Sequence, residues 1–144
     1  MATATIRDLL GNRPVLSLAP TASLRAAAKL MAEHQVGALA VIDGARLAGI
    51  LSEPDIVFRA LARDHDADAT QVAEVMTADP VTVDLGDAIS DVLVAKLGDA
   101  FRHLPVMEAG PVVGLLSYRD VPAQYVMMFE HFREMSTSRA DDGA

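Results

Sequence analysis

A serine followed three residues later by an aspartate occurs twice in the chain, each time after a glycine and two aliphatic residues. Residues 49–56 read Gly-Ile-Leu-Ser-Glu-Pro-Asp-Ile, and residues 114–121 read Gly-Leu-Leu-Ser-Tyr-Arg-Asp-Val. In each copy the aliphatic run predicts a strand. The Ser-x-x-Asp pattern that follows predicts a capping box, in which the hydroxyl and the carboxylate accept amide protons at a helix start. Helix capping alone accounts for the two residue types at this spacing.

The same strand-to-helix corner can also hold a ligand. A helix N-terminus presents free backbone N–H groups, and a fixed carboxylate can accept two hydrogen bonds from adjacent hydroxyls of a sugar. Hydrogen bonds to a charged acceptor contribute about 1.5 to 3 kcal/mol each. We therefore predict that Ser52 with Asp55, and Ser117 with Asp120, cap their helices and also bind a ribose.

The two corners belong to a longer internal repeat, in which residues 36–56 align with residues 101–121 without a gap. Hydrophobic periodicity predicts the same order of elements, β-α-β-β-α, in both halves. Six positions of this window are identical in the two copies: Leu39 and Leu104, Val41 and Val106, Gly49 and Gly114, Leu51 and Leu116, Ser52 and Ser117, Asp55 and Asp120.

The repeat predicts an α/β (α+β) fold in which two halves pack face to face with pseudo-two-fold symmetry. A short three-stranded sheet covered by helices on one face leaves its other face exposed, and pairing the halves covers it. We predict a first repeat over residues 1–66, a second repeat with an extended C-terminal helix over residues 67–134, and a disordered tail over residues 135–144. An apolar stripe on the last helix predicts a homodimer interface, and it comprises Val121, Tyr125, Met128, Phe129 and Phe132.

Composition and charge exclude several classes of protein. The net charge of −8, with only two lysines, argues against binding to nucleic acid. No uncharged run reaches the roughly 18 residues of a membrane span, and the first ten residues do not look like a secretion signal, so we expect a cytoplasmic protein. The absence of cysteine excludes thiolate chemistry and disulfides.

Motifs of common catalysts are also missing from the sequence. It contains no nucleophile elbow, phosphate loop, dinucleotide fingerprint or His-Glu-x-x-His pattern, so we expect no enzymatic activity and no obligatory cofactor. The acidic connector at residues 64–68 could hold a divalent ion, but it lacks the glycine and the terminal glutamate of an EF-hand. We therefore predict a solvated loop there and no metal site.

The chain resembles tandem cystathionine-β-synthase (CBS) domain pairs, or Bateman modules, which often sense adenine nucleotides. The resemblance covers nearly all of residues 5–125 and rests on the two Gly-h-h-Ser-x-x-Asp-h motifs, where h is aliphatic, and on the strands that precede them. These strands begin Val-Gly-Ala-Leu-Ala-Val at residue 36 and Phe-Arg-His-Leu-Pro-Val at residue 101. The duplication of the whole set in register makes the resemblance specific.

The resemblance implies roles for individual residues. Asp55 and Asp120 would bind ribose hydroxyls, with Ser52 and Ser117 beside the ribose or phosphate. The backbone near the start of each long strand would border the adenine, Thr82 would lie at the mouth of the second pocket, and basic side chains would contact phosphates. The residues implied in these last three roles are Val36, Gly37, Ala38, Phe101, Arg102, His103, Thr82 and Arg119.

Other interpretations remain open for some of these residues, and the two sites are expected to differ. Arg102 and Arg119 could be ordinary surface cations, and Phe101 could be a core residue. The first copy has Gly37 and Ala38 where the second has an arginine and a histidine, and it has a proline where relatives often carry arginine.

Two hypotheses of function follow. The first is a non-catalytic regulatory module that binds AMP, ADP, ATP or an NAD-like ligand between its repeats and acts on an unidentified protein partner. The second is a structural subunit for dimerisation or interaction, whose pockets are vestigial. A shift in melting temperature with nucleotide would distinguish them, because ligand at 100 times its Kd adds about 2.7 kcal/mol of stability.

Overall fold

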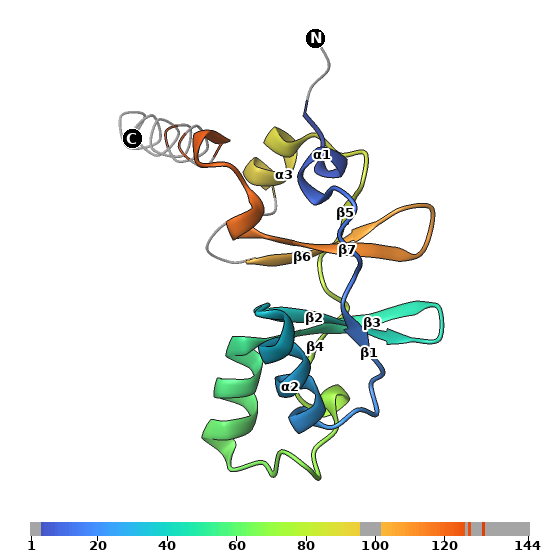
Figure 1. Cartoon of the computed structure of the whole chain (residues 1–144), viewed down its shortest axis with the longest axis vertical. Helices are drawn as coiled ribbons and strands as arrows, with labels where there is room; N and C mark the ends of the chain where they lie inside the picture. Colours follow the sequence, from blue (N-terminus) through green and yellow to red (C-terminus); the bar gives the residue numbers. More distant parts are fainter. Residues whose placement is uncertain (1–3, 96–101, 126, 128–130, 132–144) are drawn as a thin grey trace, which may run out of the picture.

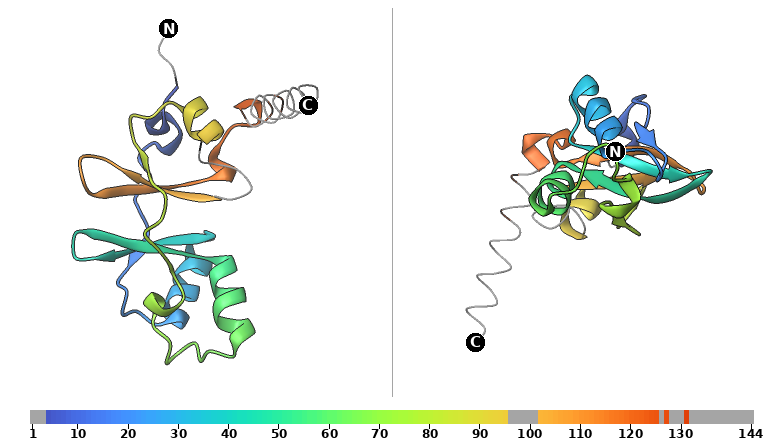
Figure 2. Two further views of the ribbon diagram at one scale, coloured as in Figure 1. Left: turned by 180° about the vertical axis from the view of Figure 1, so that it is seen from behind. Right: turned by 90° about the horizontal axis from the view of Figure 1, so that it is seen from below.

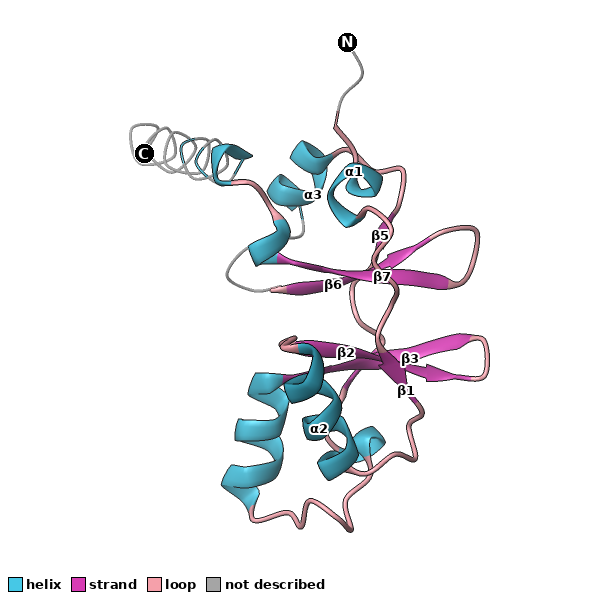
Figure 3. Cartoon of the chain, in the orientation of Figure 1, coloured by secondary structure: helices cyan, strands magenta, loops and turns pink. Residues whose placement is uncertain are grey.

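Two small β-sheets face each other at the centre of the molecule, and helices cover their outer faces (Figures 1 and 3). The computed structural model describes residues 4–95, 102–125, 127 and 131 of the 144-residue chain. The predicted α+β architecture of two stacked repeats is confirmed. No helix within these described residues is long and apolar enough to cross a membrane.

The first sheet has four strands in the order β1-β2-β3-β4. Strands β1 (Ser17–Leu18) and β2 (Ala38–Asp43) are parallel, whereas β3 (Arg46–Ser52) is antiparallel to both of its neighbours. A hairpin joins β2 to β3, and Gly44 has a φ of 64° in its turn. The fourth strand, β4 (Thr77–Ala78), was not predicted.

Two helical segments cover the outer face of this sheet (Figure 1). Helix α2 (Leu24–His34) begins at Ser23, whose side chain accepts a hydrogen bond from the amide of Ala26. The second helical segment covers residues 53–63, as the capping box at Ser52 predicts, but most of it has wider or tighter turns than an α-helix: η1 (Asp55–Ala60) is a π-helix and η2 (Leu61–Arg63) a 3₁₀ helix.

The second sheet has three strands in the order β5-β6-β7. They are β5 (Val83–Asp84), β6 (His103–Met107) and β7 (Val112–Ser117), with β5 and β6 parallel and β7 antiparallel to β6. Helix α3 (Ile89–Ala95) precedes β6, and the short 3₁₀ helix η4 (Tyr118–Asp120) follows β7. The order matches that of the first sheet without its fourth strand.

Strand alternation gives each sheet an outer and an inner apolar face. In β2, Leu39 and Val41 are fully buried in the outer core, beneath the apolar side of α2. Ala38 and Ala40 alternate with them, so they lie on the face that meets the second sheet, and both are buried. Their small side chains allow the two sheets to approach closely.

The segment that precedes each sheet packs against the other sheet. Helix α1 (Ile6–Leu10) belongs to the first repeat in sequence, yet its Ile6 amide donates to the Asp87 carbonyl at 2.9 Å. The buried side chains of α1 lie in the core of the second sheet. Conversely, the Val72 amide of η3 (Val72–Glu74) donates to the Ala22 carbonyl at 2.8 Å, and β4 pairs with β3. Figure 2 shows the chain crossing between the two layers in both places.

The two segments that pack against the sheet of the other repeat, α1 with the connection after it and η3 with β4, are called the exchanged segments below. Gly49 and Gly114, which are identical in the two repeats, make room for them. A Cβ on Gly49 would lie 2.5 Å from the Thr77 carbonyl oxygen and 3.0 Å from the Met76 sulfur. A Cβ on Gly114 would lie 2.6 Å from a methyl group of Leu10. Leu10 and Met76 are therefore counterparts, each lying over the glycine of the sheet it covers.

The described part of the last helix does not form a free apolar stripe. Val121 is 7% exposed and belongs to the core of the second sheet, and Tyr125 packs against the same core. Val121 therefore stabilises its own repeat rather than an interface. The other members of the predicted stripe, Met128, Phe129 and Phe132, lie outside the described residues, as does the predicted disordered tail at residues 135–144.

Candidate ligand-binding site

The first strand-to-helix corner encloses its aspartate. The Ser52 amide donates to Asp55 Oδ2 at 3.0 Å and the Asp55 amide donates to Ser52 Oγ at 3.4 Å, which together form the predicted capping box. The Ser52 hydroxyl also donates to Asp55 Oδ2 at 3.0 Å. The Thr77 hydroxyl donates to Asp55 Oδ1 at 3.3 Å, and Arg59 Nε lies 3.8 Å from the same oxygen. Asp55 is only 7% exposed, so both of its oxygens are engaged inside the protein.

The second corner has the same frame but a more accessible aspartate. The Ser117 amide donates to Asp120 Oδ2 at 2.8 Å, and the Ser117 hydroxyl accepts from the Arg119 amide at 3.2 Å. The other carboxylate oxygen, Oδ1, lies 2.9 Å from Nη1 of Arg13. The Asp120 side chain is twice as exposed as that of Asp55, 18% against 9%, and its partner Arg13 is half exposed.

The predicted backbone neighbours of the first corner lie where expected. Ala38 pairs with Ser52 in the β2–β3 ladder, and the Gly37 carbonyl accepts from the Glu53 amide at 3.0 Å. Val36 is half-buried against the outer core. Residues 36–38 are thus held beside the start of the helix that carries Asp55.

The second corner repeats this arrangement with different side chains. His103 pairs with Ser117 in the β6–β7 ladder, and the Arg102 carbonyl accepts from the Tyr118 amide at 3.0 Å. Arg102 is exposed, as is Arg119. Thr82 is half-buried directly before β5, and Phe101 lies outside the described residues.

The two corners meet at Gly37. A Cβ on this residue would lie 2.6 Å from Glu53 Oε1, in its own repeat, and 3.5 Å from His103 Nε2, in the other repeat. The missing side chain therefore leaves room for Glu53 and allows His103 to approach across the junction between the sheets. The two sites are expected to differ because their residues differ here. In the structure the difference has a physical role, since Gly37 of one copy accommodates His103 of the other.

His103 is the titratable group at this junction whose pKa is shifted. Burial lowers the pKa of His103 below its ordinary value. The carboxylates of Glu53 and Asp120 oppose this change, and the charges of Arg119 and Arg102 add to it. His103 is therefore neutral at pH 7 in the folded protein, and an anion placed beside it would favour its protonated form.

Acidification is expected to destabilise the protein through His103. Because its pKa is lower in the folded state than in the unfolded chain, where it is about 6.5, the unfolded state binds more protons below that pH. The free energy of unfolding should then fall as the pH drops below about 6.5, and the contribution of His103 should be constant above it. Urea denaturation at pH 7.5 and 5.5 measures this effect.

His103→Asn should reduce the pH dependence between these two conditions, whereas the exposed His34 provides a control through His34→Asn. An unchanged difference between pH 7.5 and 5.5 in His103→Asn would contradict the assignment to His103.

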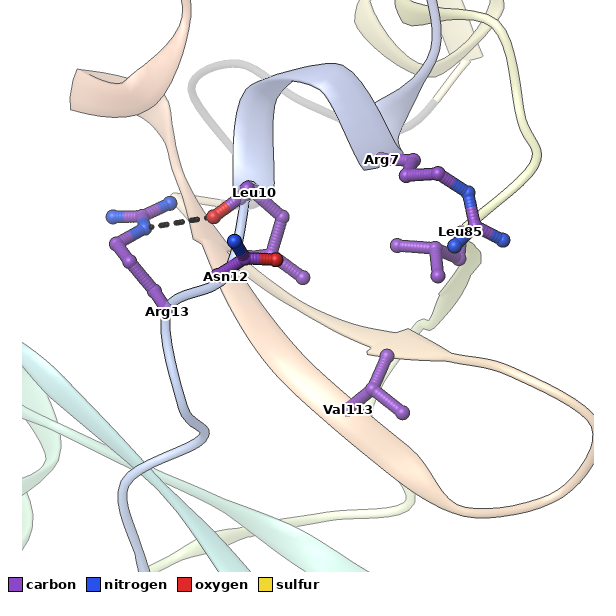
Figure 4. Close-up of a pocket in the computed structure, with 7 residues that line it drawn as sticks. Arg7, Leu10, Asn12, Arg13, Leu85 and Val113 are labelled. Atoms are coloured by element: carbon purple, nitrogen blue, oxygen red, sulfur yellow. Dashed lines mark hydrogen bonds between the residues drawn. The ribbon is translucent and has the colours of Figure 1, made fainter.

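A cavity of about 340 Å³ lies next to the second corner, between α1 and the second sheet (Figure 4). Arg13 and Arg7 stand on opposite sides of it, and Leu85 and Val113 form part of its apolar wall. None of the residues predicted to bind ligand lines this cavity. The cavity is formed where α1 packs against the sheet of the other repeat, and local sequence patterns do not predict that packing.

Four residues that contact the corners were not predicted from the sequence, and one of them, Arg59, lies four residues after Asp55 on the same helix. Thr77 and Arg13 reach the two aspartates from the exchanged segments, and Glu53 lies between Gly37 and the helix start. Leu10 and Met76 lie over the glycines of the two sheets, so their segments are equivalent in the structure. Local sequence patterns do not reveal that each segment crosses to the other repeat.

Comparison with known proteins identifies the class to which this arrangement belongs. A family model for the CBS domain matches the chain twice, over residues 6–61 and 72–121. The chain therefore belongs to the CBS-domain family and carries two copies of the domain. The predicted resemblance is confirmed.

Relatives and solved structures are similar over most of this chain. An uncharacterized 17.7 kDa protein of Acidianus ambivalens is 37% identical over 120 residues, which cover 82% of this chain and 71% of its own length. A CBS domain protein of Pyrobaculum aerophilum, solved in complex with AMP, is 28% identical with a TM-score of 0.77, over 89% of this chain and 99% of its own. A hexameric CBS-CP12 protein from bloom-forming cyanobacteria is 26% identical with a TM-score of 0.72, over 83% and 70%.

Proposed function

We propose that the protein is a non-catalytic regulatory module that binds an adenosine-containing ligand, such as AMP, ADP, ATP or an NAD-like molecule, between its two CBS repeats. The observation that carries this proposal is the second corner, where a fixed carboxylate is accessible beside a helix start. Asp120 is oriented by the Ser117 amide, and its Oδ1 contacts the half-exposed Arg13. A ribose diol is a suitable partner for such a carboxylate.

The charges around this corner support a phosphorylated ligand. His103 pairs with Ser117 in the β6–β7 ladder, so the adjacent Arg102 and the following Arg119 and Asp120 belong to one corner of a protein whose overall charge is −8. The arginines supply local positive charge for a phosphate, and the carboxylate remains for the sugar. The AMP complex of the Pyrobaculum aerophilum relative supports the same class of ligand.

The two corners are proposed to divide their roles. Within the described residues, Asp55 is contacted by Ser52, Thr77 and Arg59 and is almost fully buried, so its function is structural in the ligand-free protein. Asp120 is contacted by Ser117 and Arg13 and is more exposed. We therefore assign the ligand to the second corner.

Titration calorimetry with AMP, ADP, ATP and NAD tests the proposal directly. Binding of at least one of them is expected, together with a rise in melting temperature that grows with ligand concentration. Absence of heat and of any thermal shift with all four would favour the alternative, a structural interaction subunit with vestigial pockets. Regulation of a protein partner would require the ligand to prefer one arrangement of the repeats over another.

The proposal includes a homodimer formed through the helix over residues 53–63. Three large apolar side chains on this helix are exposed in the single chain: Val57 at 46%, Phe58 at 68% and Leu61 at 62%. Contiguous apolar groups of this kind mark interaction surfaces in soluble proteins. The hexameric cyanobacterial relative supports self-association within the family. The cytoplasmic location expected from the sequence stays a prediction.

Charge on this helix should therefore dissociate the dimer. The double variant Phe58→Glu, Leu61→Glu is expected to elute as a monomer of about 15.3 kDa, while the wild-type protein elutes at twice that mass. Size-exclusion chromatography with light scattering measures the mass. Val81→Glu, which changes an exposed apolar residue outside this helix, provides the control. A dimer that persists in the double variant would place the interface elsewhere.

A further inference from the structure

Arg13 reaches the second corner from the other repeat. It lies in the connection between α1 and β1, 107 residues away from Asp120 in sequence. Its Nη1 lies 2.9 Å from Asp120 Oδ1, and its Nε donates to the Leu10 carbonyl at 3.3 Å (Figure 4). The guanidinium group is thus held at the end of α1 while its outer nitrogen contacts the carboxylate.

The partner of Arg13 distinguishes it from the other arginines with ion pairs. Arg25 contacts Asp68 and Arg7 contacts Glu108, and all four of these side chains are well exposed. Exposed ion pairs of this kind change a folding equilibrium by no more than about fivefold. Arg13, in contrast, occupies an oxygen of the carboxylate that is proposed to hold the ligand.

Binding of a ribose would change the contacts of Arg13. A diol donates one hydrogen bond to each oxygen of a carboxylate, and Asp120 Oδ2 already accepts from the Ser117 amide. A sugar hydroxyl at Oδ1 therefore competes with the N–H groups of Arg13. The displaced guanidinium would remain next to the ligand, because its Nε is held by the Leu10 carbonyl and its side chain is half exposed. A phosphate offers it two parallel acceptors in place of the carboxylate.

We propose that Arg13 determines the preference of the second corner for nucleoside phosphates over nucleosides. In the free protein it pairs with Asp120, and in the complex it exchanges this carboxylate for the phosphate of the ligand. A nucleoside without phosphate must break the ion pair and gains no replacement. This inference rests on the proposed function, since it requires an adenosine-type ligand at Asp120.

Calorimetric titrations with adenosine and with AMP test the exchange in the 144-residue chain. In Arg13→Ala, adenosine should bind up to about fivefold more tightly, because its competitor is gone. AMP should bind about tenfold or more weakly, because a charge-assisted contact is lost. The preference for AMP over adenosine should therefore fall by more than tenfold. Arg13→Lys, which keeps the charge, should retain part of that preference.

Arg25→Ala provides the matched control, since Arg25 is a half-exposed arginine with an aspartate partner in the first repeat, and it should bind both ligands like the wild type. The role of Arg13 is overturned if Arg13→Ala leaves the ratio of the two affinities unchanged while AMP still binds. The proposed function itself fails if adenosine, AMP, ADP, ATP and NAD all fail to bind to the folded wild-type protein and to Arg13→Ala, which overturns both proposals together.

Discussion

Asp120→Ala is expected to weaken AMP binding by at least about a hundredfold. The substitution removes both carboxylate oxygens that a ribose diol would use, and each hydrogen bond to a charged acceptor contributes about 1.5 to 3 kcal/mol. Since each 1.4 kcal/mol changes an affinity tenfold, two such bonds account for the expected loss. Calorimetry with AMP measures the affinity. The folded state should lose only about 1 kcal/mol, which is typical of a lost helix cap.

The equivalent substitution in the first corner, Asp55→Ala, should lower the stability of the fold more and the affinity for AMP less. Asp55→Ala removes an almost fully buried carboxylate and leaves the amide and hydroxyl of the half-buried Ser52 without their acceptor, whereas the hydroxyl of the exposed Thr77 can turn to water. Each unsatisfied buried donor costs about 1 to 3 kcal/mol, so the loss of stability should exceed that of Asp120→Ala. AMP affinity should change less than threefold. If Asp55→Ala instead abolished AMP binding and Asp120→Ala did not, the ligand would belong to the first corner.

Gly49→Ala is expected to destabilise the protein by about 1 to 2 kcal/mol. Its new methyl group would lie 2.5 Å from the Thr77 carbonyl oxygen, a backbone atom of β4 that cannot move without disturbing its pairing with β3. Overpacking in a close-packed interior typically costs about 1 to 3 kcal/mol. The restriction of the unfolded chain by alanine offsets this by only about 0.4 to 1 kcal/mol. Urea denaturation at an unchanged m-value measures the difference.

Two other glycines provide controls for Gly49→Ala. Gly114→Ala should cost less, because the atoms it meets are methyl groups at the end of the flexible Leu10 side chain. Gly86→Ala should be nearly neutral, since its methyl group would lie 3.3 Å from a carboxylate oxygen of the exposed Asp84. A loss of stability in Gly114→Ala as large as in Gly49→Ala would mean that the buried Leu10 side chain is held as firmly as the backbone of β4.

Local patterns predicted the two corners well because the interactions that form them are local. Ser52 and Asp55, like Ser117 and Asp120, are three residues apart, and a capping box depends on that spacing alone. The β2–β3 hairpin likewise depends on a short turn. The backbone neighbours of each corner then follow from strand register, which the repeat alignment reflects.

The contacts that distinguish the two corners could not be predicted in this way. Thr77 lies 22 residues from Asp55, and Arg13 lies 107 residues from Asp120. The apolar face of α1 indicates that this helix must pack against a sheet. Both sheets have an apolar outer face, and hydrophobic periodicity does not predict which of them α1 covers. The position of Arg13 therefore depends on the exchange of segments, which is a property of the whole fold.

That exchange has a consequence for the origin of the chain. If each repeat were a separate polypeptide, two copies that swapped their leading segments would produce the same pair of sheets, with Leu10 and Met76 covering the glycines of the opposite copy. The protein is thus equivalent to a domain-swapped dimer whose subunits have been fused end to end. Because both copies belong to one chain, their residues can differ, and one difference is that an arginine faces Asp120 where a threonine faces Asp55.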